Sequence, residues 1–137
     1  MLVVDQLTKA WAVNALDDGP IVFIDGFLRF RLAFNTGAAF STFTRSGPLL
    51  GLLVIGVVIF ILFALRDTAH RAEAIGLGLV LGGAIGNLAD RLLRGDGFID
   101  GAVVDFIDWW FIPTFNIADS AVFIGVVVLL ISSLFRR

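Results

Sequence analysis

Residues 48–65 read PLLGLLVIGVVIFILFAL, an apolar run without a charged side chain. As an α-helix it would be about 27 Å long, close to the thickness of a bilayer's hydrocarbon core, which is about 30 Å. Pro48 suits a helix start because the missing N–H needs no partner there, and the polar residues Arg66 and Asp67 follow the run. The stretch therefore predicts a transmembrane helix.

Three further stretches are candidate membrane helices. Residues 116–135 form a second apolar run, which is followed by two arginines. Residues 72–89 are apolar but rich in glycine, which allows membrane helices to pack closely. Residues 1–16 make a helix shorter than the hydrocarbon core, and two charged residues interrupt it. We therefore expect four membrane helices, the first of which lacks its beginning.

A cleaved secretory signal peptide is the alternative interpretation of residues 1–16. It is disfavoured because Asp5 lies in the apolar part and no basic residue precedes it. The composition fits a membrane protein, since 58% of the residues are hydrophobic and only 16% are charged. The absence of cysteine excludes disulfides, thiolate metal sites and a cysteine nucleophile. A net charge of -2 with scattered basic residues disfavours nucleic-acid binding.

Four membrane helices place the connections 17–47 and 90–115 on one side of the membrane and residues 66–71 on the other. The arginine counts on the two sides are nearly equal, so they leave the orientation open. We place both termini in the cytoplasm, because the arginines on that side lie directly at helix ends. Apolar runs and period-two alternation at residues 21–24 and 28–34 predict strands of a small sheet at the membrane surface. A hairpin that merely covers helix ends is the simpler alternative.

Ionisable side chains at membrane depth are costly and are usually retained for a purpose. Asp5 and Lys9 lie one helical turn apart, which favours an intrahelical ion pair. Asn87, Asp90 and Arg91 share one helix face and could reach a common partner. The alternative for the last two is that they only mark the membrane interface.

Two carboxylates stand out in the second half of the chain. Asp105 lies in a connection, and Asp119 lies near the start of a membrane helix. Asn116 could cap that helix with Asp119 as its third residue, which would explain Asp119 but not Asp105. Asn35 lies among small residues in Phe34-Asn-Thr-Gly-Ala-Ala-Phe, where a plain turn explains most of the pattern.

Five motifs in this order resemble the signature of the lipoprotein signal peptidase (signal peptidase II) family. They are Asp-Gln-x-x-Lys from Asp5, Phe-Asn-x-Gly-Ala-Ala-Phe from Phe34, Gly-Asn-x-x-Asp-Arg from Gly86, Val-Val-Asp-Phe from Val103 and Phe-Asn-x-Ala-Asp from Phe115. The resemblance covers nearly the whole chain. It implies one peptidase domain over residues 1–137, an all-α membrane protein with four transmembrane helices. A small extracytoplasmic β-sheet and a short extracytoplasmic loop or helix over the active site complete the implied fold.

The resemblance also implies the activity and the site. The implied enzyme is an aspartyl endopeptidase of the bacterial inner membrane that removes the signal peptide of diacylglyceryl-cysteine prolipoproteins at the extracytoplasmic face. The implied catalytic pair is Asp105 and Asp119, and two close carboxylates suit acid–base catalysis because they tend to share one proton. The implied supporting residues are Asn35, Asn87, Asp90, Arg91 and Asn116, with Asp5 and Lys9 as a structural tether.

No metal or cofactor is expected, and the expected partners are a prolipoprotein with a lipid-modified cysteine and membrane lipids. We expect a monomer that binds no nucleic acid. The segment at residues 94–102 is longer than the corresponding segment usually is in the family. The segment at residues 108–113 is shorter than usual. Two other functions stay open: a catalytically impaired homologue that binds prolipoproteins, and a small ion-coupled transport protein, which should carry its charges nearer the bilayer midplane.

Overall fold

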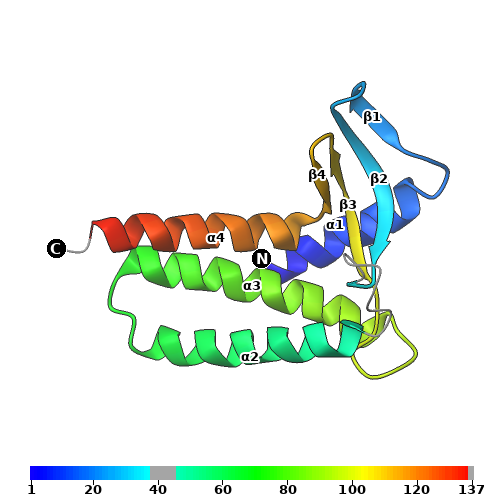
Figure 1. Ribbon diagram of the computed structural model, residues 1–137. Coiled ribbons are helices and arrows are strands. Elements are labelled where there is room, and N and C mark those ends of the chain that lie inside the picture. Colours follow the sequence, from blue (N-terminus) through cyan, green and yellow to red (C-terminus); the bar gives the residue numbers. More distant parts are fainter. Residues whose placement is uncertain (38–45, 136–137) are drawn as a thin grey trace.

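Four helices and a four-stranded sheet make up the protein, as seen in a computed structural model that describes residues 1–37 and 46–135. The helices are α1 (Leu2–Ala15), α2 (Ser46–Arg66), α3 (Arg71–Leu93) and α4 (Ile117–Leu134). The strands are β1 (Ile21–Ile24), β2 (Leu28–Asn35), β3 (Val103–Trp109) and β4 (Ile112–Phe115). Figure 1 shows α2, α3 and α4 side by side, with the sheet at one end of this bundle and α1 leading toward it.

Three helices in the described part of the chain are long and apolar enough to cross a membrane: Pro48–Arg66, Arg71–Leu93 and Ile117–Leu134. Helix α1 has 14 residues, so it is about 21 Å long and shorter than the hydrocarbon core. The predicted helix boundaries lie close to the observed ones, except that the glycine-rich helix continues past residue 89 to Leu93. The last helix begins at Ile117 because Asn116 is its N-cap.

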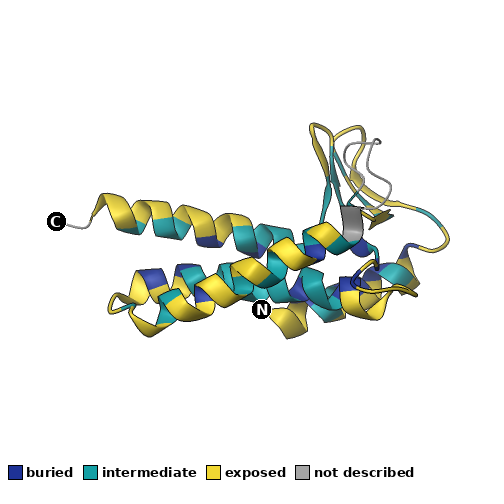
Figure 2. Cartoon of the chain, turned by 60° about the horizontal axis from the view of Figure 1, so that its bottom comes forward, coloured by how far each residue is buried: buried dark blue, intermediate teal, exposed yellow. Residues whose placement is uncertain are grey.

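Large apolar side chains cover the outer surfaces of the helices. Exposed residues recur along α2 and α4, as Figure 2 shows. Phe60 and Phe123, for example, are 69% and 70% exposed. In water such a surface would be unfavourable at about 25 cal/mol per Å². It is the surface expected of helices that are surrounded by lipid.

Helices α3 and α4 approach each other closely at glycines. A side chain on Gly125 would meet the carbonyl oxygen of Gly76 at 2.6 Å, and one on Gly83 would overlap the carbonyl of Ala118. The glycine-rich sequence was predicted to permit this close packing, and the prediction is confirmed. The contact at Gly83 matters for the site, since Ala118 lies in the first turn of α4.

The sheet is antiparallel with the strand order β1-β2-β3-β4. Strands β1 and β2 confirm the prediction from the apolar run at residues 21–24 and the alternating residues 28–34. Strands β3 and β4 were not predicted: they occupy the second part of the connection after α3, for which a short loop or helix was expected. Residues 94–102, the first part, form a loop without a helix. Asp105 therefore lies on a strand and pairs with Ala33 of β2.

An apolar cluster attaches the sheet to α1. Ala12 and Leu16 pack with Phe106 of β3, and Phe30 of β2 lies against them. Trp11 contacts the rings of Phe30 and Phe106 edge to face, at centroid distances of 5.4 and 6.0 Å. Edge-to-face pairs add to the free energy of apolar burial. The short first helix thus supports the strand that carries Asp105.

The loop between α3 and β3 is anchored on α2 by one strained residue. Ile99 is buried and has a φ of 56°, a left-handed conformation that is unfavourable for a β-branched residue. Its side chain occupies the space where a side chain on Gly51 would lie. Burial of Ile99 against α2 therefore offsets the backbone strain and fixes the loop that leads into β3.

Candidate active site

Asp119 is oriented by the first turn of α4. The Asn116 side chain accepts the Asp119 N–H at 2.9 Å, and Asp119 Oδ2 accepts the Asn116 N–H at 3.1 Å. This is a capping box, in which two unpaired backbone donors are satisfied reciprocally. The predicted cap is confirmed, and it leaves Asp119 Oδ1 facing another partner. That partner is Asn87 of α3, whose Nδ2 donates to Asp119 Oδ1 at 2.8 Å.

The Asn116 amide also reaches Asp105, and it thereby connects the two carboxylates. Its Nδ2 donates to Asp105 Oδ1 at 2.8 Å and to Asn87 Oδ1 at 3.0 Å. One side chain therefore binds β3 at Asp105 and caps the turn that holds Asp119. The strand and the helix bring together two residues that are fourteen positions apart in the sequence.

The two carboxyl groups have different surroundings. Asp105 is 3% exposed, whereas Asp119 is half-buried. Burial, and secondarily the negative charge of Asp119, raise the pKa of Asp105 to about 6. Hydrogen bonds from Asn35 and Asn116 and the charge of Lys9 act in the opposite direction. Asp105 is therefore suited to hold a proton near neutral pH.

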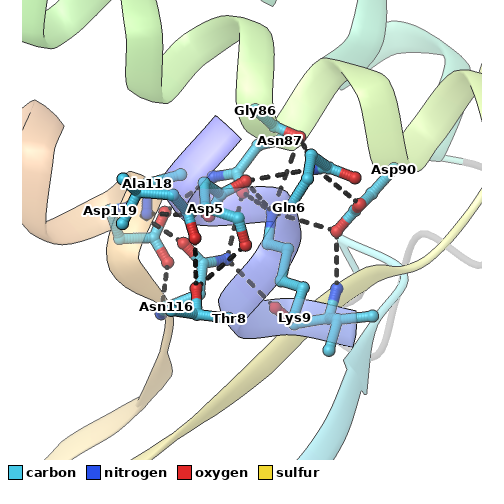
Figure 3. A network of polar contacts seen from close by, with 12 residues as sticks. Asp5, Gln6, Thr8, Lys9, Gly86, Asn87, Asp90, Asn116, Ala118 and Asp119 are labelled. Carbon is cyan, nitrogen blue, oxygen red and sulfur yellow. Dashed lines mark hydrogen bonds and ion pairs between the residues drawn. The ribbon is translucent and has the colours of Figure 1, made fainter. Parts of the chain in front are cut away.

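A buried charged cluster of Asp5, Lys9 and Asp90 adjoins Asn87, and Figure 3 shows it in one network with Asn116 and Asp119. Lys9 and Asp5 form the predicted intrahelical ion pair at 2.9 Å. Lys9 Nζ also lies 3.0 Å from Asp90 Oδ2 and donates to Asn87 Oδ1 at 2.9 Å. Asn87, Asp90 and Arg91 were predicted to reach a common partner, and the prediction is confirmed for the first two, whose common partner is Lys9.

Asn35 and Arg91 lie at the edges of the same region. Asn35 ends β2 and hydrogen-bonds Asp105 with its side chain, while its Oδ1 accepts the Gly37 N–H at 2.9 Å. The remaining motif residues 38–40 lie outside the described residues. Arg91 is buried within electrostatic reach of Asp105, and its Nη1 has no hydrogen-bond partner among the residues that the structure describes. A buried donor without a partner is unusual and is available to a ligand.

Two residues of the cluster were not predicted from the sequence. Gln6 Nε2 donates to the Gly86 carbonyl at 3.1 Å and to Asp90 Oδ1 at 3.2 Å. Arg94 Nε donates to Asp90 Oδ1 at 3.1 Å. Signals for both were present, because Gln6 belongs to the first motif and Arg94 follows Asp90 by one helical turn.

Two grooves lead to the carboxylates. An apolar groove of about 600 Å³ reaches Asp119, and its other lining residues include Phe111, Phe115 and Phe123. A second groove of about 310 Å³ reaches Asp105 along the end of β2. Pro113 lines both grooves. An extended chain with an apolar group could therefore contact both carboxylates.

Known proteins resemble this chain over nearly its whole length. The family profile described as "Signal peptidase (SPase) II" matches residues 1–135. The lipoprotein signal peptidase of Rhodococcus jostii is 44% identical, covering 98% of this chain and 68% of that protein. That of Mycobacterium avium is 41% identical, covering 98% of this chain and 75% of that protein.

A solved structure of a bacterial membrane enzyme superposes with a TM-score of 0.87 at 29% identity, covering 99% of this chain and 88% of that one. A second gives a TM-score of 0.83, also at 29% identity, over 97% of this chain and 82% of that one. The likeness thus extends from the sequence to the whole fold, and the chain belongs to the signal peptidase II family.

Proposed function

We propose that Asp105 and Asp119 are the catalytic pair with which this chain cleaves the signal peptide from prolipoproteins. Membership of the signal peptidase II family makes the chain an aspartic peptidase that processes prolipoproteins. The observation that supports this choice of aspartates is the Asn116 amide, which hydrogen-bonds Asp105 while it caps the helix turn of Asp119. A pair held in this way can share one proton and position one water.

The surroundings of the two carboxyls suggest their roles. Asp105, whose pKa is raised to about 6, is the acid that donates its proton to the scissile carbonyl oxygen. Asp119 is the base that takes a proton from the attacking water. When the tetrahedral intermediate collapses, Asp119 returns a proton to the leaving amine, and Asp105 recovers its own from the hydroxyl. All protons are accounted for by these two side chains and one water.

The supporting residues are proposed to act on the substrate and on the pair. The unpartnered Nη1 of Arg91 is a donor for a substrate carbonyl or for the developing oxyanion. Asn35 is placed to hold the substrate backbone beside Asp105, because it lies at the strand end that lines the smaller groove. Asn87 and Asn116 keep the carboxylates oriented.

The proposed substrate carries a diacylglyceryl group on its cysteine. The apolar groove of about 600 Å³ that opens on Asp119 supports this proposal, since aromatic and aliphatic side chains line most of it. Cleavage on the amino side of the modified cysteine would place the lipid beside the carboxylates.

We further propose that residues 1–137 form one domain that acts as a monomer in the bacterial inner membrane. All four helices contribute to the membrane part, and the sheet faces the extracytoplasmic side. The exposed apolar side chains of α1, such as Val3 and Leu7, support its place in lipid. A single chain supplies both carboxylates and their hydrogen-bond partners, which supports a monomer.

The orientation can be tested by thiol labelling, because the chain contains no cysteine. Asp96 lies in the exposed loop before β3, and Asp67 lies in the exposed connection at the opposite end of the bundle. In cells whose outer envelope has been removed and whose inner membrane is intact, a membrane-impermeant maleimide should label the Asp96→Cys variant and not the Asp67→Cys variant. The reverse pattern would contradict the orientation.

The catalytic assignment is tested with Asp105→Asn and Asp119→Asn in a gel-shift cleavage assay. The substrate is a prolipoprotein, offered with and without its diacylglyceryl group. Each substitution should reduce turnover by about 10²- to 10⁴-fold while the protein remains inserted and folded. Asp96→Asn, an exposed substitution of the same kind, is the matched control and should leave turnover unchanged. Wild-type turnover by either catalytic-pair variant would refute the assignment.

A further inference from the structure

Lys9 is the centre of contacts that lead to both proposed catalytic aspartates. It is completely buried, and its ammonium lies within 3.0 Å of three side-chain acceptors, Asp5 Oδ2, Asp90 Oδ2 and Asn87 Oδ1. The Gly86 carbonyl is a fourth, more distant acceptor at 3.5 Å. We propose that Lys9 is a positioning residue that sets the separation of Asp105 and Asp119 through these acceptors. This inference rests on the proposed function of the two aspartates.

The first two contacts reach the backbone immediately before each catalytic residue. Asp5 Oδ1 accepts the N–H of Ala118, which precedes Asp119. Asp90 Oδ2 accepts the N–H of Val104, which precedes Asp105. These hydrogen bonds are both 3.0 Å long and both buried. Asp5 thus binds the start of α4, Asp90 binds the strand β3, and Lys9 forms ion pairs with both.

The third contact orients a side chain of the site itself. Lys9 donates to Asn87 Oδ1, so the other end of that amide, Nδ2, must point away from the ammonium. Nδ2 is the group that donates to Asp119 Oδ1. Asn116 Nδ2 also donates to Asn87 Oδ1, so the ammonium is one of two donors that hold the amide in this orientation. Without the ammonium, this orientation would depend on Asn116 alone.

Burying the Lys9 ammonium to join two backbone segments costs desolvation free energy, and this cost supports a positioning role. Replacing buried ion pairs by apolar residues is often neutral or stabilising, so stability alone explains such a cluster poorly. A satisfied buried network does, however, define one geometry closely. Misplacement of reacting groups by about 1 Å can reduce a rate about 100-fold. The gain from Lys9 is therefore expected in turnover.

The pH dependence of turnover reports this separation. Two nearby carboxylates lose their protons in two steps whose spacing increases as the groups approach each other. Among the described residues, Lys9 on α1 and Arg91 on α3 act electrostatically on Asp105, and Asp5 and Asp90 are the ion-pair partners of Lys9. A variant that changes only the electrostatic field should shift the acidic and the basic limb of the pH profile of kcat in the same direction. A variant that separates the carboxylates should narrow the interval between the limbs.

The test uses the double variant Asp5→Asn/Lys9→Met, which breaks these contacts without changing the net charge of the cluster. Asp90 keeps a cationic partner in Arg94, so no buried charge is left unpaired. Thr8→Val is the matched control, because among the described residues the Thr8 hydroxyl bonds only to carbonyl oxygens of its own helix. Folding is checked by thermal unfolding in detergent, and kcat, KM and the kcat profile are then measured.

For the double variant we expect kcat to fall about 100-fold with KM unchanged and the pH interval narrowed. If it does not fold, Asp5→Asn alone is measured, since asparagine still offers an acceptor to Ala118, and the same direction of change is expected. A wild-type kcat and pH interval in the folded variant would overturn the inference. Asp105→Asn and Asp119→Asn are assayed in parallel. If these two variants cleave normally, the proposed function itself fails. If they do not cleave but the double variant keeps the wild-type kcat and pH interval, only the role of Lys9 is refuted.

Discussion

Asp105→Asn is expected to stabilise the folded protein at neutral pH although it reduces cleavage. Asp105 is almost completely buried, and its pKa is raised from an ordinary 3.8 to about 6. Between these two values the folded state binds more protons at this site than the unfolded state does. The contribution of Asp105 to stability is therefore fully present below pH 3.8 and is lost as the pH rises through 6.

The size of this loss of stability follows from the difference of about two pH units between the pKa of Asp105 in the folded protein and its ordinary value. At 1.36 kcal/mol per unit it amounts to about 3 kcal/mol above pH 7, which is an upper figure because the neighbouring charges are coupled. An asparagine keeps the oxygen that accepts from Asn116 and carries no charge. The variant should consequently be more stable than the wild type by up to about 3 kcal/mol at pH 8, and this advantage should vanish near pH 4.

The measurement is thermal unfolding in detergent micelles at a series of pH values between 4 and 8. Asp96→Asn serves as the control, since Asp96 is exposed and its replacement should give no difference that depends on pH. The reasoning would be refuted if Asp105→Asn melts at the wild-type temperature at pH 8. It would also be refuted if the difference stays constant down to pH 4, because burial of a charge would then not be the cause.

Two further substitutions test the packing and the sheet. Gly83→Ala places a methyl group against the Ala118 carbonyl and should destabilise the protein by about 1 to 3 kcal/mol, whereas Gly78→Ala on the same helix meets nothing within 4 Å and should be tolerated. Equal melting temperatures for the two glycine variants would contradict this account of helix packing. Asp108→Asn removes the carboxylate whose pKa Arg31 and Arg29 hold below its ordinary value. Its destabilising effect should be present at pH 7 and disappear as the pH falls below 3.8 through the folded-state pKa, as thermal unfolding at both ends of that range would reveal.

Periodicity and composition sufficed to predict much of the fold. The long apolar runs at residues 48–65 and 116–135 correspond to α2 and α4, because lipid requires long uninterrupted apolar helices. The apolar run of β1 and the alternating residues of β2 were also recognisable. Strand β3 was not predicted, since Val103–Phe106 is buried and does not alternate, and its pairing with β2 depends on contacts distant in sequence. For the same reason Asp105 was assigned only to a connection between helices.

The candidate site shows a similar division. The pair Asp5 and Lys9 was predictable from a spacing of one turn, as was the cap at Asn116. The attachment of Asp5 to Ala118 and of Asp90 to Val104 was not, because these acceptors bind backbone N–H groups, which every sequence contains. Side-chain identity therefore indicated which side chains would be buried together, and only the fold indicates which backbone N–H group each carboxylate binds.

The reciprocal cap at the start of α4 also gives a way to observe readiness for catalysis in the resting enzyme. The Asp119 N–H and the Asn116 N–H are each held by the other residue's side chain, so both are released if this first helical turn unwinds. The carboxylate of Asp119 loses its orientation in the same event. The hydrogen–deuterium exchange rates of these two amides should therefore report, without any substrate, the fraction of molecules in which the site is assembled.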